Sequence, residues 1–153
     1  MSTETTTQRK ATAFGSRRVW LVSALAGVAA AVATEVYGLL ARAVGVPMSA
    51  GSPGAAEAGP ITVGLFAMGT VICVFWGTVL AVLLARYAAN PARTYLRATL
   101  ALTVVSLASP LAAAHTAGST KLMLAVGHLI AAAIVIPVVT RRLATAPGRN
   151  GRA

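Results

Sequence analysis

The chain contains no aspartate and only three glutamates, Glu4, Glu35 and Glu57, among its 153 residues. Nucleases, aspartic proteases, magnesium-dependent phosphoryl transferases and glycosidases all need paired or clustered carboxylates. Three glutamates that fall in a tail, an apolar segment and a loop do not supply such a cluster. We therefore predict that the protein is not an enzyme and uses no cofactor.

Cysteine is equally scarce, because Cys73 is the only one. A single cysteine excludes an intrachain disulfide, a CxxC redox pair and a thiolate zinc site. Glu35, His115 and His128 are metal-ligating residue types, but their spacing is not that of a ligand set, so we predict no metal site.

Charge is low, at 10% of residues, whereas 57% are hydrophobic and the mean hydropathy is +0.77. The apolar residues gather in four runs, at 19–40, 61–84, 98–114 and 122–139. Each is within or near the ~17 to 25 residues with which a helix crosses a bilayer, and none alternates as barrel strands do. The sequence therefore predicts an all-α, four-helix transmembrane bundle over residues 19–143.

Basic residues predict the orientation of this bundle. Eleven of the 13 lie in the two tails and in the loop after the second run: Arg9, Lys10, Arg17, Arg18, Arg86, Arg93, Arg97, Arg141, Arg142, Arg149 and Arg152. Only Arg42 and Lys121 fall on the other side. Since basic flanking segments are retained in the cytoplasm, we expect both termini to be cytoplasmic, with the protein multi-pass in a bacterial cytoplasmic membrane.

Membrane topology and contact with anionic lipid headgroups thus explain the net charge of +10. We expect the lipid bilayer itself to be a partner of the protein. No basic face interleaves with aromatic residues, so we predict no binding of nucleic acid. Residues 1–18 and 144–153 are basic tails with compositions that predict disorder. Ser16-Arg17-Arg18 resembles a twin-arginine signal, but the apolar run continues past Ala33, which argues against cleavage.

Two features predict irregular backbone. The loop at 45–60 is rich in proline and glycine, so we expect a flexible cover without regular structure. Pro110 lies within the third run and should bend that helix near Ser109.

Small residues repeat every four positions in the first run. They form two neighbouring rows: Ala26, Ala30, Thr34 and Gly38, then Ser23, Gly27 and Ala31. Such rows let helices approach closely in lipid, where packing replaces the hydrophobic driving force. We therefore predict a helix-packing face, which makes this helix either an interior element or the interface of a homo-oligomer or of a membrane-protein partner.

Glu35 and His128 are the candidate polar site. A carboxylate in a membrane span is costly and is commonly turned toward the bundle interior, a partner or water. At 1.5 Å per residue, Glu35 and His128 lie about 8 and 10 Å from the same end of their antiparallel helices. A hydrogen bond between them would make a polar clasp, with a proton- or cation-binding site as the alternative.

The chain resembles an uncharacterised family of four-span actinobacterial membrane proteins, a domain of unknown function. The resemblance runs from about Val19 to Leu143 and is strongest at residues 37–47 (YGLLARAVGVP), 106–111 (SLASPL) and 120–129 (TKLMLAVGHL), the last leading to Ile136-Pro137. It implies fold and location but no activity. It also implies that the histidine at position 128 belongs to the family pattern, whereas an acid at position 35 does not reliably do so.

A second resemblance is architectural only, because small multidrug transporters also have four spans and a glutamate in the first. We therefore expect a structural or accessory membrane protein, with a small proton- or cation-coupled transporter that uses Glu35 as the alternative.

Overall fold

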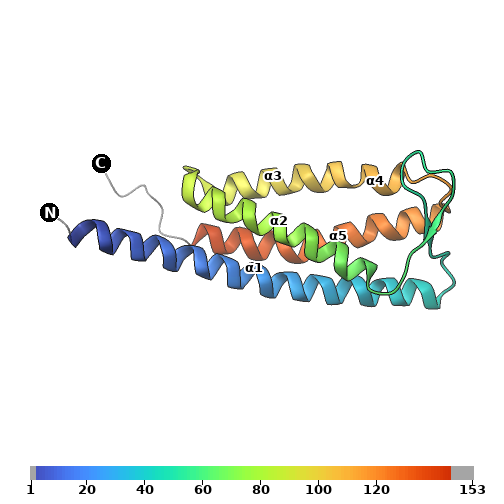
Figure 1. The fold of residues 1–153 in the computed structure, drawn as a ribbon, viewed down its shortest axis with the longest axis horizontal. Helices are drawn as coiled ribbons and strands as arrows, with labels where there is room; N and C mark the ends of the chain where they lie inside the picture. Colours follow the sequence, from blue (N-terminus) through green and yellow to red (C-terminus); the bar gives the residue numbers. More distant parts are fainter. Residues whose placement is uncertain (1–2, 146–153) are drawn as a thin grey trace.

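The computed structural model describes the backbone of residues 3–145 and the side chains of residues 18–145. Its elements are α1 (Thr3–Ala43), β1 (Ser49–Ala50), β2 (Gly59–Pro60), α2 (Leu65–Tyr87), α3 (Pro91–Ser106), α4 (Ala108–Leu111) and α5 (Gly118–Ala144). The four long helices lie side by side (Figure 1). Four described segments are long and apolar enough to cross a membrane: Arg18–Ala43, Leu65–Tyr87, Pro91–Leu111 and Gly118–Ala144. The prediction of four apolar helices is confirmed.

The first helix begins earlier than expected, and residues 3–18, predicted to be disordered, continue α1. These residues contain no proline, and an existing helix adds residues easily. Val19 packs against Leu143, whereas α5 ends at Ala144. The N-terminal part of α1 therefore extends beyond the bundle (Figure 1). Of the predicted C-terminal tail, residues 146–153 lie outside the described residues.

The third helix also starts earlier, at Pro91 rather than at residue 98. A proline suits the first helical position, where its missing N–H would have no partner in any case. Pro110 has the predicted effect, but the break falls at Leu107, between α3 and α4. Because Pro110 cannot donate to the Ser106 carbonyl four residues earlier, the regular helix ends there.

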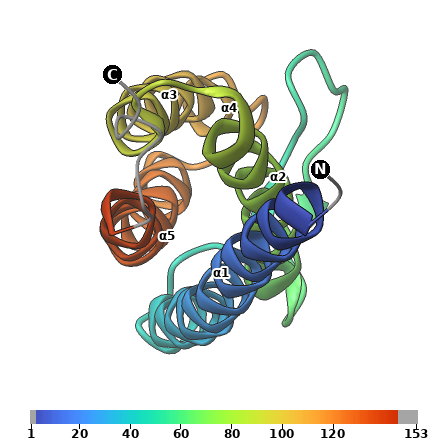
Figure 2. The same ribbon diagram turned by 90° about the vertical axis from the view of Figure 1, so that its left-hand side faces the viewer.

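The helices form a four-cornered bundle, seen end-on in Figure 2. Around it, α1 packs extensively against both α2 and α5, and α3 packs mainly against α5 and less against α2. The pair α2 and α3 is thus the loosest of the neighbouring pairs.

Two apolar clusters close the bundle near its ends. At the end where α5 stops, Val19, Ala81, Tyr95, Val139 and Leu143 are buried together. At the other end, Ala41, Ile61 and Met123 form a smaller cluster. The space between the two clusters contains most of the polar groups described below.

The loop between α1 and α2 is not the structureless cover that we predicted. Its strands β1 and β2 pair in an antiparallel ladder. Gly51 donates to the Ala114 carbonyl over 3.1 Å, and the Thr120 hydroxyl donates to the Pro47 carbonyl. Partners that are distant in the sequence, which composition does not reveal, therefore give this hairpin loop its shape.

Candidate functional site

Glu35 caps the start of α2 from a different helix. The first helical residue follows Gly64, which has a φ of +91° and supplies no capping side chain. One carboxylate oxygen of Glu35 accepts from the Gly64 N–H over 2.7 Å, and the other accepts from the Ala67 N–H over 3.1 Å. These N–H groups are among those that lack partners within their own helix, and the positive end of the helix dipole favours an anion there.

The expected hydrogen bond between Glu35 and His128 is not present among the described side chains, because each has another partner. The Nδ1 atom of His128 lies 2.8 Å from the Leu124 carbonyl oxygen, one turn earlier in α5. Since a carbonyl oxygen can only accept, Nδ1 donates, and Nε2 of a neutral ring is left as an acceptor. The structure thus does not join the two candidate residues directly.

The small-residue face of α1 is turned inward. All seven of its residues are buried: Ser23, Ala26, Gly27, Ala30, Ala31, Thr34 and Gly38. A Cβ atom on Gly27 would lie 2.7 Å from a methyl carbon of Val74 in α2, and one on Gly38 would lie 2.8 Å from the ring of Phe66. This face therefore packs against other helices of the same chain.

A buried hydrogen bond joins α1 to α2 between the two apolar clusters. The hydroxyl oxygens of Thr34 and Thr70 lie 3.0 Å apart. Thr34 also has carbonyl oxygens of its own helix within reach, at Ala30 and Ala31. Because a hydroxyl has one proton and those carbonyls can only accept, we assign Thr70 as the donor to Thr34.

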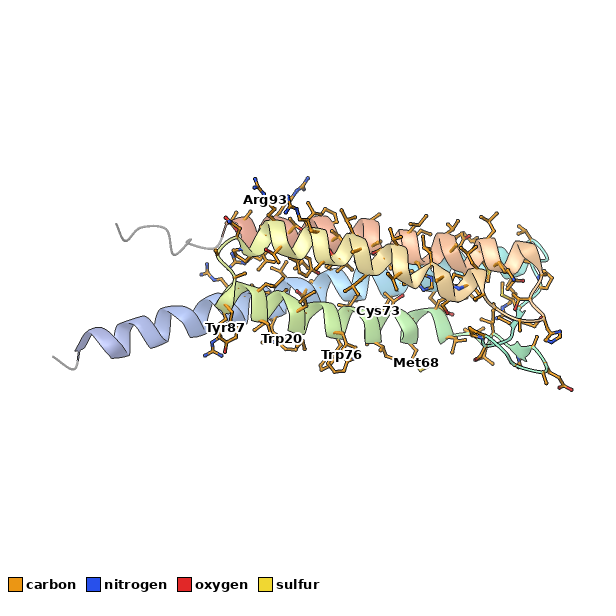
Figure 3. The ribbon with its side chains drawn as sticks, turned by 90° about the horizontal axis from the view of Figure 1, so that it is seen from above. Trp20, Met68, Cys73, Trp76, Tyr87 and Arg93 are labelled. Carbon is orange, nitrogen blue, oxygen red and sulfur yellow. The ribbon has the colours of Figure 1, made fainter. Side chains whose placement is uncertain are left out.

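A cavity of about 690 Å³ occupies the middle of the bundle. Its lining comes mainly from α2, α3 and α5 and includes His128 but not Glu35. Cys73 lines it too and is exposed. Figure 3 shows Cys73 in the space between α2 and α3, with Met68 on the outer edge of α2.

A second cavity, of about 230 Å³, lies beneath the hairpin loop and is lined by Ala50, Pro53 and Ser109 among others. His128 and Leu124 line both cavities. His128 therefore stands between the space under the hairpin loop and the interior of the bundle.

His115, the third candidate ligand type, is exposed in the connection before α5 and has a φ of +48°. Within the part of the chain that the structure describes, no three His, Cys, Asp or Glu side chains lie close enough to hold a metal ion.

Sequence reasoning missed two features of the interior. It did not single out Tyr95, which is only 1% exposed and lines the cavity. It also gave Glu35 a side-chain partner, whereas the true partners are backbone N–H groups. The available signal was Gly64 itself, because a long apolar helix whose first turn has no Ser, Thr, Asp or Asn cap needs an acceptor from elsewhere.

Four long apolar helices that pack side by side are compatible with a multi-pass membrane protein. Comparison with known families places the chain more closely: it belongs to the Family of unknown function (DUF6069), whose profile matches residues 14–145. No curated protein and no solved structure matches the chain.

Proposed function

We propose that the protein is a non-enzymatic, multi-pass protein of the bacterial cytoplasmic membrane with a structural or accessory role, in which Glu35 holds helices together and does not carry protons or cations. The supporting observation is that both carboxylate oxygens of Glu35 accept hydrogen bonds from the first turn of α2. A coupling carboxylate has to exchange its ligand, and here that exchange would expose the unpaired N–H groups of a helix end.

The charge distribution supports cytoplasmic termini. Among the described side chains, Arg18, Arg86, Arg93, Arg141 and Arg142 lie at the end of the bundle where α2 meets α3 and α5 stops. Figure 3 shows Arg93 at that end. At the hairpin end, Arg42 donates to the Ile61 carbonyl and Lys121 to the Leu111 carbonyl, so both cations bind backbone carbonyl oxygens. The excess of basic residues at one end favours that end as the cytoplasmic one.

The experiment compares thermal unfolding of the detergent-purified protein with that of Glu35→Gln, with and without a panel of lipophilic cations. Glutamine keeps one acceptor oxygen but turns an NH₂ group toward the other N–H, so we expect a loss of about 1 to 3 kcal/mol. This loss should be the same with and without each cation. Glu57→Gln, which changes the exposed glutamate of the hairpin loop, is the matched control and should unfold like the wild type. A cation that stabilises the wild type but not Glu35→Gln would refute the proposal.

One observation favours the transporter alternative, namely that His128 lines both cavities. A passage between them would run past this ring, which could exchange a proton at Nε2. In that case His128→Ala, and not Glu35→Gln alone, would abolish flux across a reconstituted bilayer.

A further inference from the structure

The cavity between α2, α3 and α5 has the size of a site for one small molecule. Its volume of about 690 Å³ falls within the roughly 300 to 1,000 Å³ of small-ligand pockets. It extends from Tyr95 near one apolar cluster to Ser106 and His128 toward the other. Tyr95 and Ser106 are separated by 11 residues of helix, which corresponds to about 16 Å.

The lining favours an uncharged, lipophilic occupant. No Lys, Arg, Asp or Glu is among the described residues that line the cavity, and most of its surface is aliphatic or aromatic. Both Cys73 of α2 and Leu102 of α3 are exposed and line it. The cavity therefore opens between the two loosely packed helices, toward what would be the acyl chains of a bilayer.

The α3 hydroxyl groups that line the cavity donate hydrogen bonds to backbone carbonyls of their own helix. Thr99 donates to the Tyr95 carbonyl, Thr103 to the Thr99 carbonyl and Ser106 to the Thr103 carbonyl. Each oxygen that faces the cavity from these residues can therefore act only as an acceptor.

Tyr95 differs from them, because its phenol has a proton with no acceptor. The residue is 1% exposed, and its hydroxyl has no hydrogen-bond partner among the described residues. The oxygen would lie 3.7 Å from a Cβ atom on Gly77 of α2, which also lines the cavity. A ligand oxygen beside Gly77 would give this phenol an acceptor that the described residues do not supply.

The row of α2 residues opposite α3 keeps this space open. Gly69, Cys73 and Gly77 follow one another at intervals of one helical turn, and all three line the cavity. A Cβ atom on Gly69 would meet nothing within 4 Å. Gly69 therefore faces open space, unlike Gly27 and Gly38 of α1, which permit close helix contact.

We propose that this cavity binds one uncharged lipophilic molecule from the bilayer, held by a hydrogen bond from the Tyr95 hydroxyl to a carbonyl oxygen of that molecule. A transmembrane helix of another protein fits less well, because the carbonyls of a regular helix already accept its own N–H groups. Quinones and the acyl esters of diacylglycerols both carry the required carbonyl and are uncharged. The proposal does not depend on the role of Glu35, which does not line the cavity.

Cys73 provides the assay, because the only cysteine of the chain lines the cavity and is exposed. The full-length protein is delipidated in detergent, and the rate of Cys73 modification by N-ethylmaleimide is followed during titration with decylubiquinone or, separately, with dioleoylglycerol. We expect one of the two probes to slow modification in a saturable manner at a fixed, low protein concentration. The probe that does so identifies the source of the carbonyl.

Three variants connect this protection to the phenol and to the cavity. Tyr95→Phe keeps the packing but removes the donor, and should weaken the apparent affinity about fivefold to tenfold, the equivalent of one hydrogen bond. Gly77→Leu, which fills the space beside the phenol, should abolish protection. Tyr87→Phe changes the exposed tyrosine at the end of α2 and should behave like the wild type.

Three results would overturn the proposal. The first is no saturable protection of the wild type by either probe. The second is protection of Tyr95→Phe that equals the wild type. The third is protection that depends on protein concentration and not on the probe, which would mean that a second copy of the chain covers the cavity.

Discussion

Gly27 and Gly69 offer a direct test of how α1 and α2 pack, because the same substitution should have opposite effects at the two positions. A Cβ atom on Gly27 would lie 2.7 Å from one methyl carbon of Val74 and 3.4 Å from its Cβ atom. Carbon atoms in favourable contact lie about 3.5 to 4.0 Å apart. Since valine in a helix is confined largely to one rotamer, we expect the helices to separate by about 1 Å.

The size of the effect follows from two opposing terms. Alanine in place of glycine in a helix gains about 1 kcal/mol at either position. Overpacking costs about 1 to 3 kcal/mol, and only at Gly27, because Gly69 has open space around it. Gly69→Ala should therefore be more stable than Gly27→Ala by about 1 to 3 kcal/mol. Separation of the helices should also stretch the 3.0 Å contact between Thr34 and Thr70.

The assay is reversible unfolding of the two variants and the wild type in the same detergent micelle, with helix content as the signal. We expect the order Gly69→Ala, wild type, Gly27→Ala from most to least stable. Equal stability of the two alanine variants would refute the close approach of α1 and α2 at Gly27.

Two further predictions concern single hydrogen bonds. In a double-mutant cycle, Thr34→Val and Thr70→Val should be coupled by about 0.6 kcal/mol, a typical value for hydrogen bonds between membrane helices, and additive effects would show that the bond contributes nothing. Thr120→Val removes the donor to the Pro47 carbonyl, so amide hydrogen exchange should accelerate in residues 44–64 while the rate in α2 stays unchanged; exchange that does not change in the loop would show that the hairpin is held by other contacts.

The spans could be predicted from the sequence because hydropathy and length suffice to find an apolar helix. The inward face of α1 was equally visible, since small residues at four-residue spacing must share one side of a helix. The early start of α3 was hidden by Arg93 and Arg97, which interrupt the apolar pattern although the helix includes them.

The partners of Glu35 are the N–H groups of Gly64 and Ala67, and backbone groups leave little residue pattern beyond the glycine that precedes α2 without a capping side chain. The hairpin loop was missed because the contacts that order it, such as that from Gly51 to the Ala114 carbonyl, join residues far apart in the sequence. The cavity depends on the spacing of α2 and α3, which helix periodicity does not determine. Glycine at 27 and glycine at 69 look alike in the sequence, yet one lies at a close contact and the other at a void.

The role of Glu35 is tested most directly by ion flux through the reconstituted protein. Proteoliposomes that contain a pH-sensitive dye are given a proton or sodium gradient, and dissipation is compared for the wild type, Glu35→Gln and Glu57→Gln. If Glu35 only caps α2, all three should dissipate the gradient at the rate of liposomes without protein. Faster dissipation by the wild type and by Glu57→Gln, with Glu35→Gln at the rate of protein-free liposomes, would contradict the structural role and make Glu35 the coupling residue of a transporter.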